Sequence, residues 1–516
     1  MQKDAVKKAL LAIGFTLLLG GLVCARLGAL PGLNLDEAWV GLRALDIQKA
    51  GLFTPHGMNW YTGPFHTLLV SKIFAVFGAG VFQLRLTGAV LNVAAAGGMA
   101  LFVALAFGLE SFFVFAALML ASPFYIFESR IAWEVCALQN ILAAVSLIAT
   151  WQIARQGRAG LLSLLALFYA SAMGSINHLI FIAFPFGLAF GFFAWQAESG
   201  NRRFGNLTVA AAANVACALA LLIAKKHLSD SFWLAHKLPV TALFAGLPAL
   251  AALAVWRWRE KCGETAAALA NRIHSSDKAR GALRWLAITG LLACLWFHAT
   301  AFMGTFSGYN VFRRLFSLDL GLVAATALFI WAAIITGAVF SAAFGALENG
   351  GESDERLFTA ITLAGMAAVF TIFRNTNSMR YYILPFFVFV FAAAVFLPDY
   401  LRRSGVKTRA FLALCAATAL LVSCSEIAAP KQRRPFHFLQ GWHDETSARM
   451  MDIAWLAKKL ENEKICGFEG DPFITMPLEF MYKTQPWQCE PGRSFTAGYC
   501  YECETAPYIR GYSADR

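Results

Sequence analysis

Apolar segments separated by short polar stretches run through the first 427 residues of the chain. A helix that crosses the hydrocarbon core of a bilayer needs about 20 mainly apolar residues. Segments of that kind lie near 8–30, 86–107, 112–127, 135–154, 161–176, 179–195, 207–224, 239–256, 285–302, 319–346, 357–373, 381–398 and 409–427. The pattern predicts an all-α polytopic membrane protein with about 13 transmembrane helices.

One further apolar stretch, 65–82, is ambiguous because it carries His66 and Lys72. Cytoplasmic loops are enriched in Lys and Arg, and the lysine-rich N-terminus belongs inside by that rule. If 65–82 does not span, all of the basic loops fall inside: 155–158, 202–203, 257–284 and 402–409. We therefore expect a juxtamembrane or re-entrant helix on the outer face at 65–82, a cytoplasmic N-terminus and a periplasmic C-terminus.

A cleaved signal peptide is the alternative for residues 1–30. The apolar run is long for a signal peptide, and no small-x-small cleavage site follows it. We expect it to be retained as the first transmembrane helix.

The tail, 428–516, is polar and rich in proline, which predicts a small external domain beside the transmembrane domain, 1–427. An amphipathic helix over 448–463 and short strands near 465–468 make this domain mixed α/β. Four of the eleven cysteines lie in it: Cys466, Cys489, Cys500 and Cys503. They favour two disulfides in one of three connectivities, with half of a zinc site or a redox pair at Cys500 and Cys503 as the alternatives. Disulfides indicate an oxidising periplasm, hence a bacterial inner membrane.

Composition excludes several classes of protein. The chain is 59% apolar and 14% charged, whereas a soluble domain is about 45–50% apolar and about 25% charged. A soluble enzyme, a disordered protein and an ordinary nucleic-acid binder are all excluded. The net charge of +12 reports mainly the topology rather than an acidic partner.

Ionisable residues gather at the outer ends of the predicted helices. Asp36 and Glu37 follow the first span; they are either functional carboxylates or a helix-start signal. Glu134 and Arg130 precede the fourth span, and Arg380 precedes a late span. Arginine binds phosphate bidentately, so these residues predict an outer cleft with carboxylates at its centre. Further outward cations surround it, among them Arg313, Arg314, Lys225, Lys226 and His178.

Four motifs occur in order: Asp36-Glu37, Tyr61-Thr62-Gly63-Pro64-Phe65-His66, Arg130-x-x-x-Glu134 and Arg380-Tyr381-Tyr382-Ile383-Leu384-Pro385. Over residues 8–400 this order resembles the C-type glycosyltransferase superfamily. It is most similar to the bacterial relatives of dolichyl-phosphate-mannose protein mannosyltransferases and to the lipid A aminoarabinose transferase.

The resemblance implies transfer of a hexosyl or pentosyl group from a polyprenyl-phosphate donor to a lipid, glycan or protein acceptor on the periplasmic side. Asp36 would be the general base of an inverting displacement, Glu37 would orient it or the acceptor, and Glu134 would bind the acceptor or the sugar. The aminoarabinose transferase has a lysine where this chain has Gly63. The donor phosphate would therefore be bound by Arg380 first, then by Arg130 or Arg313.

The resemblance also implies substrate contacts for Tyr61, His178 and Tyr381, with a satisfied buried histidine as the alternative for His178. No cofactor is expected to be required, although Asp36, Glu37 and Glu134 form an oxygen-rich set of the kind that holds a divalent cation.

A transporter or flippase of lipid-linked sugars is the competing class. Such proteins place polar or broken helices at the bilayer midplane, often with an inverted repeat. Here the ionisable residues lie at helix ends on one side and no repeat is visible, so the enzyme is the better prediction.

Overall fold

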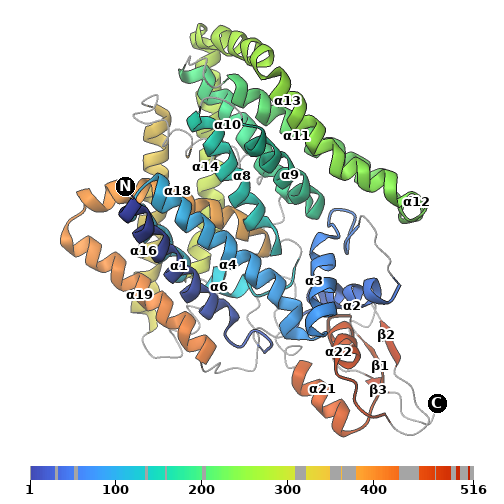
Figure 1. Ribbon diagram of the computed structural model, residues 1–516. Coiled ribbons are helices and arrows are strands. Elements are labelled where there is room, and N and C mark those ends of the chain that lie inside the picture. Colours follow the sequence, from blue (N-terminus) through green and yellow to red (C-terminus); the bar gives the residue numbers. More distant parts are fainter. Residues whose placement is uncertain are drawn as a thin grey trace.

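The computed structural model is predominantly helical (Figure 1). The residues that the structure describes are 2–29, 33–50, 56–133, 137–156, 160–199, 205–307, 321–348, 359, 362, 379–428, 453–470, 472–489, 496–499 and 510–511.

The membrane part consists of long helices and a few short ones. The helices are α1 (Gln2–Cys24), α4 (Val81–Ala106), α5 (Leu109–Leu120), α6 (Pro123–Glu128), α8 (Gln139–Gln156), α9 (Leu161–Asn177), α10 (Ala183–Ser199), α11 (Gly205–His227), α12 (Asp230–Ala235), α13 (Lys237–His274), α14 (Asp277–Ser307), α16 (Gly321–Glu348), α18 (Ile383–Arg403) and α19 (Val406–Ala428). Two 3-10 turns, η1 (Leu179–Ile182) and η3 (Met379–Tyr382), precede α10 and α18.

Five of the described helices are long and apolar enough to cross a membrane, namely α1, α4, α11, α13 and α18. Each of the thirteen predicted segments contains helical residues; in 357–373 only 359 and 362 are described, and both are helical. Segment 112–127 is not one helix. Ser122 interrupts it, because its Oγ accepts a hydrogen bond from Tyr125 N (3.1 Å) and caps α6, with Pro123 at the first helical position.

Two shorter helices, α2 (Leu35–Ala50) and α3 (Phe65–Phe77), lie at one end of the bundle (Figure 1). They lie beside the described residues of 453–511, which we call the outer domain after the position that the sequence predicts for them. With 13 residues, α3 is about 20 Å long, which is shorter than a bilayer core of about 30 Å. It ends at Gly78, whose φ of 78° is the left-handed conformation that glycine tolerates best. The stretch 65–82, expected to be one juxtamembrane or re-entrant helix, is therefore divided: α3 covers 65–77, and residues 81–82 already belong to α4.

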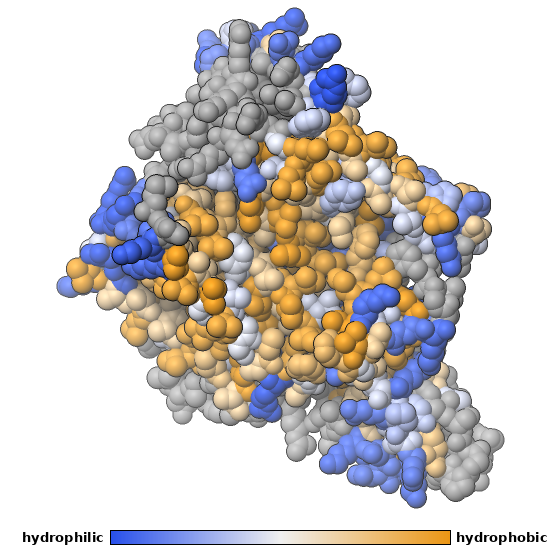
Figure 2. Space-filling view, in the orientation of Figure 1, coloured by the Kyte–Doolittle hydropathy of each residue, from blue (hydrophilic) through white to orange (hydrophobic). Residues whose placement is uncertain are grey.

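The core of the membrane part is built around α18, whose residues from Ile383 to Pro398 are almost all buried. It packs against α5 and α16, while α1 packs against α4. Apolar side chains cover the middle of the visible surface and hydrophilic ones gather around its edges and on the outer domain (Figure 2). Exposed Leu10 and Leu17 on α1 fit a surface that faces lipid rather than water.

The outer domain contains α21 (Ile453–Asn462), β1 (Gly467–Gly470), α22 (Pro472–Thr484), β2 (Thr496–Tyr499) and β3 (Arg510–Gly511). Strand β1 is central, parallel to β2 and antiparallel to β3. A disulfide joins Cys466 to Cys489, and Cys500 and Cys503 lie outside the described residues. Ile453, Ala457 and Leu460, at helical spacing, form the buried face of α21.

Candidate functional site

The first motif begins helix α2 with a capping box. The Oδ1 atom of Asn34 accepts a hydrogen bond from Glu37 N (3.0 Å), and Glu37 Oε2 accepts one from Asn34 N (3.4 Å). This reciprocal pair satisfies two backbone N–H groups at the start of the helix. The helix-start interpretation therefore holds for Glu37, and it fixes Asp36 as the second residue of α2.

The Glu37 carboxylate is fully buried and forms an ion pair with Arg85 of α4. Arg85 donates from Nε to Glu37 Oε1 (2.8 Å) and from Nη2 to Oε2 (2.7 Å), and both side chains have no exposed surface. Ala132 N also donates to Oε1 (2.9 Å). Both carboxylate oxygens of Glu37 are therefore occupied by donors of the protein itself. The orienting role expected for Glu37 stays a prediction.

This ion pair joins three parts of the chain. Arg85 Nη1 donates to the Leu27 carbonyl after α1 (3.1 Å), and Ala132 belongs to the third motif. Trp133 Nε1 adds a hydrogen bond to Asn34 Oδ1 (3.0 Å). The first and third motifs therefore meet at the start of α2, where Asp36 is half-exposed.

Arg130 is buried next to this network rather than displayed on the surface. Its Nη2 donates to the Leu22 carbonyl of α1, and its guanidinium lies 4.8 Å from the ring centroid of Phe127. Nε and Nη1 have no hydrogen-bond partner among the described residues. Burial, and secondarily the charge of Arg85, lowers the pKa of Arg130 to about 10, so the group stays charged at neutral pH.

The three aromatic residues expected to contact substrate form one cluster. The ring centroids of Tyr61 and His178 are 5.6 Å apart, and those of His178 and Tyr381 are 5.5 Å apart. Leu179 N donates to the Tyr61 carbonyl (2.9 Å). His178 Nδ1 accepts from Ile180 N (3.2 Å), so Nδ1 carries no proton and the ring caps η1.

Gly63 lies against the end of α9 with no room for a side chain. Gly63 N donates to the Asn177 carbonyl (2.7 Å), and a Cβ atom at position 63 would lie 2.3 Å from the Ile176 carbonyl oxygen. The family's lysine therefore does not fit this backbone arrangement.

Lys225 of α11 is also buried, although the sequence placed it among the outward-facing cations. Its Nζ donates to the carbonyls of Thr62 (2.6 Å) and Ile176 (2.8 Å). It thus holds the Tyr61–Gly63 segment against the end of α9.

The motif segments are connected to one another by contacts. Tyr382 packs on Phe124 of α6 with ring centroids 5.7 Å apart, and α6 leads directly into the segment that bonds Glu37. Its neighbour Tyr381 reaches His178, and His178 reaches Tyr61. Described residues of all four motifs, far apart in the sequence, are therefore linked by a series of contacts that passes through His178 and through α6.

Other predicted site residues are not tested by the structure. Glu134 and Arg313 lie outside the described residues, as does the side chain of Arg380, whose backbone is in η3. In the part of the chain that is described, no three His, Cys, Asp or Glu side chains are close enough together to hold a metal ion.

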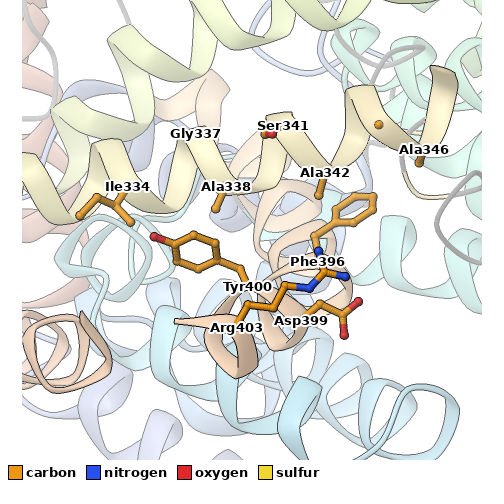
Figure 3. A pocket seen from close by; sticks show the side chains of 11 residues that line it. Ile334, Gly337, Ala338, Ser341, Ala342, Ala346, Phe396, Asp399, Tyr400 and Arg403 are labelled. Atoms are coloured by element: carbon orange, nitrogen blue, oxygen red, sulfur yellow. The ribbon is translucent and has the colours of Figure 1, made fainter. Parts of the chain in front are cut away.

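A cavity of about 640 Å³ opens between α16 and α18 (Figure 3). Small residues of α16, such as Gly337 and Ala338, form one wall, and Asp399, Tyr400 and Arg403 line the other. These residues are at the end of α18 opposite to Tyr381 and Tyr382. The cavity is therefore separate from the motif cluster.

No family model and no curated protein matches the chain. Among solved structures, it is similar to ArnT from Cupriavidus metallidurans in the apo state, with 15% identity over 92% of this chain and 85% of that one and a TM-score of 0.39. For ArnT bound to undecaprenyl phosphate, the identity is 14% over 91% of this chain and 84% of that one, with a TM-score of 0.36. The chain is also similar to the archaeal oligosaccharyltransferase AglB from Archaeoglobus fulgidus, in complex with an inhibitory peptide and a dolichol-phosphate. Here the identity is 15% over 88% of this chain and 59% of that one, with a TM-score of 0.46.

Both ArnT and AglB belong to the superfamily that the motifs of this chain resemble. The TM-scores below 0.5 describe a similarity only. We therefore base the proposed function on the motifs and on the contacts within this chain.

Proposed function

We propose that the protein is an integral-membrane inverting glycosyltransferase. It moves a hexosyl or pentosyl group from a polyprenyl-phosphate donor to a lipid, glycan or protein acceptor at the periplasmic face of a bacterial inner membrane. The observation that carries the proposal is that contacts connect segments of all four motifs. Ala132 N bonds Glu37, while Tyr61 and Tyr381 both pack on His178, and Tyr382 packs on Phe124 of the helix that leads into the third motif.

In the proposed reaction, Asp36 takes the proton of the acceptor hydroxyl as its oxygen attacks the anomeric carbon. The bond from that carbon to the phosphate oxygen breaks, polyprenyl phosphate leaves, and the configuration inverts. Asp36 suits this role because it is half-exposed, whereas the adjacent Glu37 is engaged with Arg85. The base needs only hydrogen-bond reach of the acceptor and an appropriate pKa.

Cations stabilise the charge that develops on the leaving phosphate. We assign this role first to Arg380, and then to Arg130 and Arg313. Arg130 supports the assignment because two of its N–H groups make no hydrogen bond within the described part of the chain. Glu134 would bind the acceptor or the sugar, and the cluster of Tyr61, His178 and Tyr381 would contact the substrate.

A divalent cation has no role in the proposed mechanism. Glu37 would be an obvious ligand, yet both of its oxygens already accept hydrogen bonds from Arg85 and from backbone N–H groups. Recruiting it to a metal would break a buried ion pair, which is costly.

The test is a transfer assay with purified protein, a panel of radiolabelled undecaprenyl-phosphate sugars and a membrane extract as acceptor. We expect label to reach an extractable product with the wild type and with Asp46→Asn, an exposed carboxylate on the same helix, but not with Asp36→Asn. Transfer that survives Asp36→Asn would refute the assigned base. If no donor in the panel is consumed, the enzymatic proposal is wrong and transport of the lipid-linked sugar takes its place.

A further inference from the structure

The outer domain contacts the helix that carries Asp36 through one aromatic side chain. Phe480 of α22 is fully buried and lies over Gly41 of α2. A Cβ atom at position 41 would be 2.3 Å from Phe480 Cε2 and 2.7 Å from Cδ2. The ring thus occupies the space that any other residue at position 41 would need, and the absence of a side chain lets α22 approach α2 closely.

The same ring contacts the second of the two shorter helices. Phe480 stacks on Phe74 of α3, with ring centroids 6.1 Å apart and an interplanar angle of 25°. Around it lie Val40, Ala44 and Val70, all fully buried. Helices α2, α3 and α22 therefore pack around one small apolar core, next to the membrane part (Figure 1).

Helix α22 has two apolar faces that serve different cores. Met476 and Phe480, four residues apart and so on one side of the helix, pack against α2 and α3. Leu478 and Met481 pack instead into the core of the outer domain, which includes the Cys466–Cys489 disulfide. The position of Phe480 is thereby fixed by a folded domain rather than by a loose tail.

On α2, two of the contacts that fix the helix are one turn apart. Glu37 and Gly41 lie at i and i+4 on the same side of the helix; one is bonded to Arg85 and the other is covered by Phe480. Without Phe480, α2 would keep Glu37 and its packing on α3, where Gln48 Nε2 donates to the Ser71 carbonyl (2.9 Å), but it would lose the side chain that fills the space over Gly41 and could turn about its axis. Rotation by about 20° would move a side chain about 6 Å from the axis by about 2 Å, and a misplacement of about 1 Å can cost about 100-fold in rate.

We propose that Phe480 is a positioning residue, through which the outer domain fixes the orientation of α2 and hence of Asp36. The catalytic consequence rests on the proposed function. The mechanical coupling between the outer domain and α2 does not.

The test uses the full-length protein and the non-additivity of a contacting pair. Gly41→Ala should lower kcat at least tenfold with the donor KM unchanged, because the added methyl displaces the ring. Phe480→Ala should lower kcat similarly, and Phe480→Leu should recover most of the rate. Adding Gly41→Ala to Phe480→Ala should change kcat less than twofold, since the methyl then has room. Matched controls are Gly98→Ala, whose Cβ would meet no atom within 4 Å, and Phe77→Ala, an exposed ring.

Hydrogen exchange of the α2 amides supplies a readout that needs no substrate. Phe480→Ala should speed exchange over residues 38–47 while α1 stays unchanged and the Cys466–Cys489 disulfide remains formed. If the two substitutions multiply in kcat, or if α2 exchange is unchanged, the positioning role is refuted. If the wild type transfers no sugar while α2 exchange still responds to Phe480→Ala, the proposed function fails and the coupling stands.

Discussion

Replacing Glu37 with glutamine would leave the buried Arg85 guanidinium facing a neutral amide. At the observed 2.7 Å and an effective dielectric constant of about 20, the gross attraction of the pair is about 6 kcal/mol. Part of it only offsets the cost of burying both charges. Removing one partner of a buried pair typically costs about 3–5 kcal/mol, and we expect Glu37→Gln to lower the free energy of unfolding by that amount.

The assay is reversible unfolding of the purified protein in detergent micelles, monitored by tryptophan fluorescence. Replacing both partners, as Glu37→Leu with Arg85→Met, should give a protein more stable than Glu37→Gln, because no buried charge is left unpaired. Recovery should be incomplete, since Ala132 N and the Leu27 carbonyl lose their partners, at about 1–3 kcal/mol for an unsatisfied buried group. The matched control is Glu110→Gln. This residue pairs with Arg402 at 3.5 Å, and both side chains are 63% exposed, so the change should be below about 1 kcal/mol.

A loss below about 1 kcal/mol for Glu37→Gln would refute the reasoning, since it would mean that Arg85 is adequately solvated without the carboxylate. A double variant no more stable than Glu37→Gln would contradict it as well. In that case the hydrogen bonds to Ala132 and Asn34, rather than the charge, would hold the start of α2.

Three further predictions concern the same scaffold. Gly63→Ala should cost about 1–3 kcal/mol of stability because its Cβ would press on the Ile176 carbonyl, whereas Gly14→Ala, in open space on α1, should be neutral or stabilising in the same unfolding assay. Lys225→Met should lower the free energy of unfolding by about 2–3 kcal/mol, because two hydrogen bonds to backbone carbonyls are lost. Lys226→Met should lower it by less than about 1 kcal/mol, because this exposed side chain makes only a cation–π contact with Trp60 among the contacts described. Cys466→Ser with Cys489→Ser should destabilise the outer domain by about 3 kcal/mol, since the bridge spans 23 residues; limited proteolysis of full-length protein should then cleave the tail first.

Much of the helical framework is predictable from the length of apolar runs alone. A run of about 20 apolar residues has few alternatives to a helix in a membrane protein. The sequence does not give the length of α13, which continues from its apolar part through the charged residues to His274. Hydropathy cannot predict this charged part of the helix, because a helix outside the bilayer does not need apolar side chains.

The site could be predicted only in part. The motifs selected Tyr61 and Tyr381, and the position of a basic residue in the family that the chain resembles selected His178; the fold brings the three together. It missed Arg85, a single cation in an otherwise apolar helix that reads as an interfacial residue until its partner is known. It also missed Phe480, because nothing in a local pattern states which distant glycine an aromatic ring will cover.

In the first motif, the helix geometry gives Asp36 and Glu37, two neighbouring carboxylates, different surroundings. Consecutive residues of an α-helix point about 100° apart. A helix that begins at Leu35 therefore cannot direct Asp36 and Glu37 to the same side. Glu37 faces the core, where the capping box, Arg85 and Ala132 hold it, and Asp36 is left half-exposed at the end of the bundle. The buried carboxylate fixes the direction of α2. In the proposed mechanism this direction places Asp36 to act as the base, so we expect Glu37→Gln to impair transfer as well as stability.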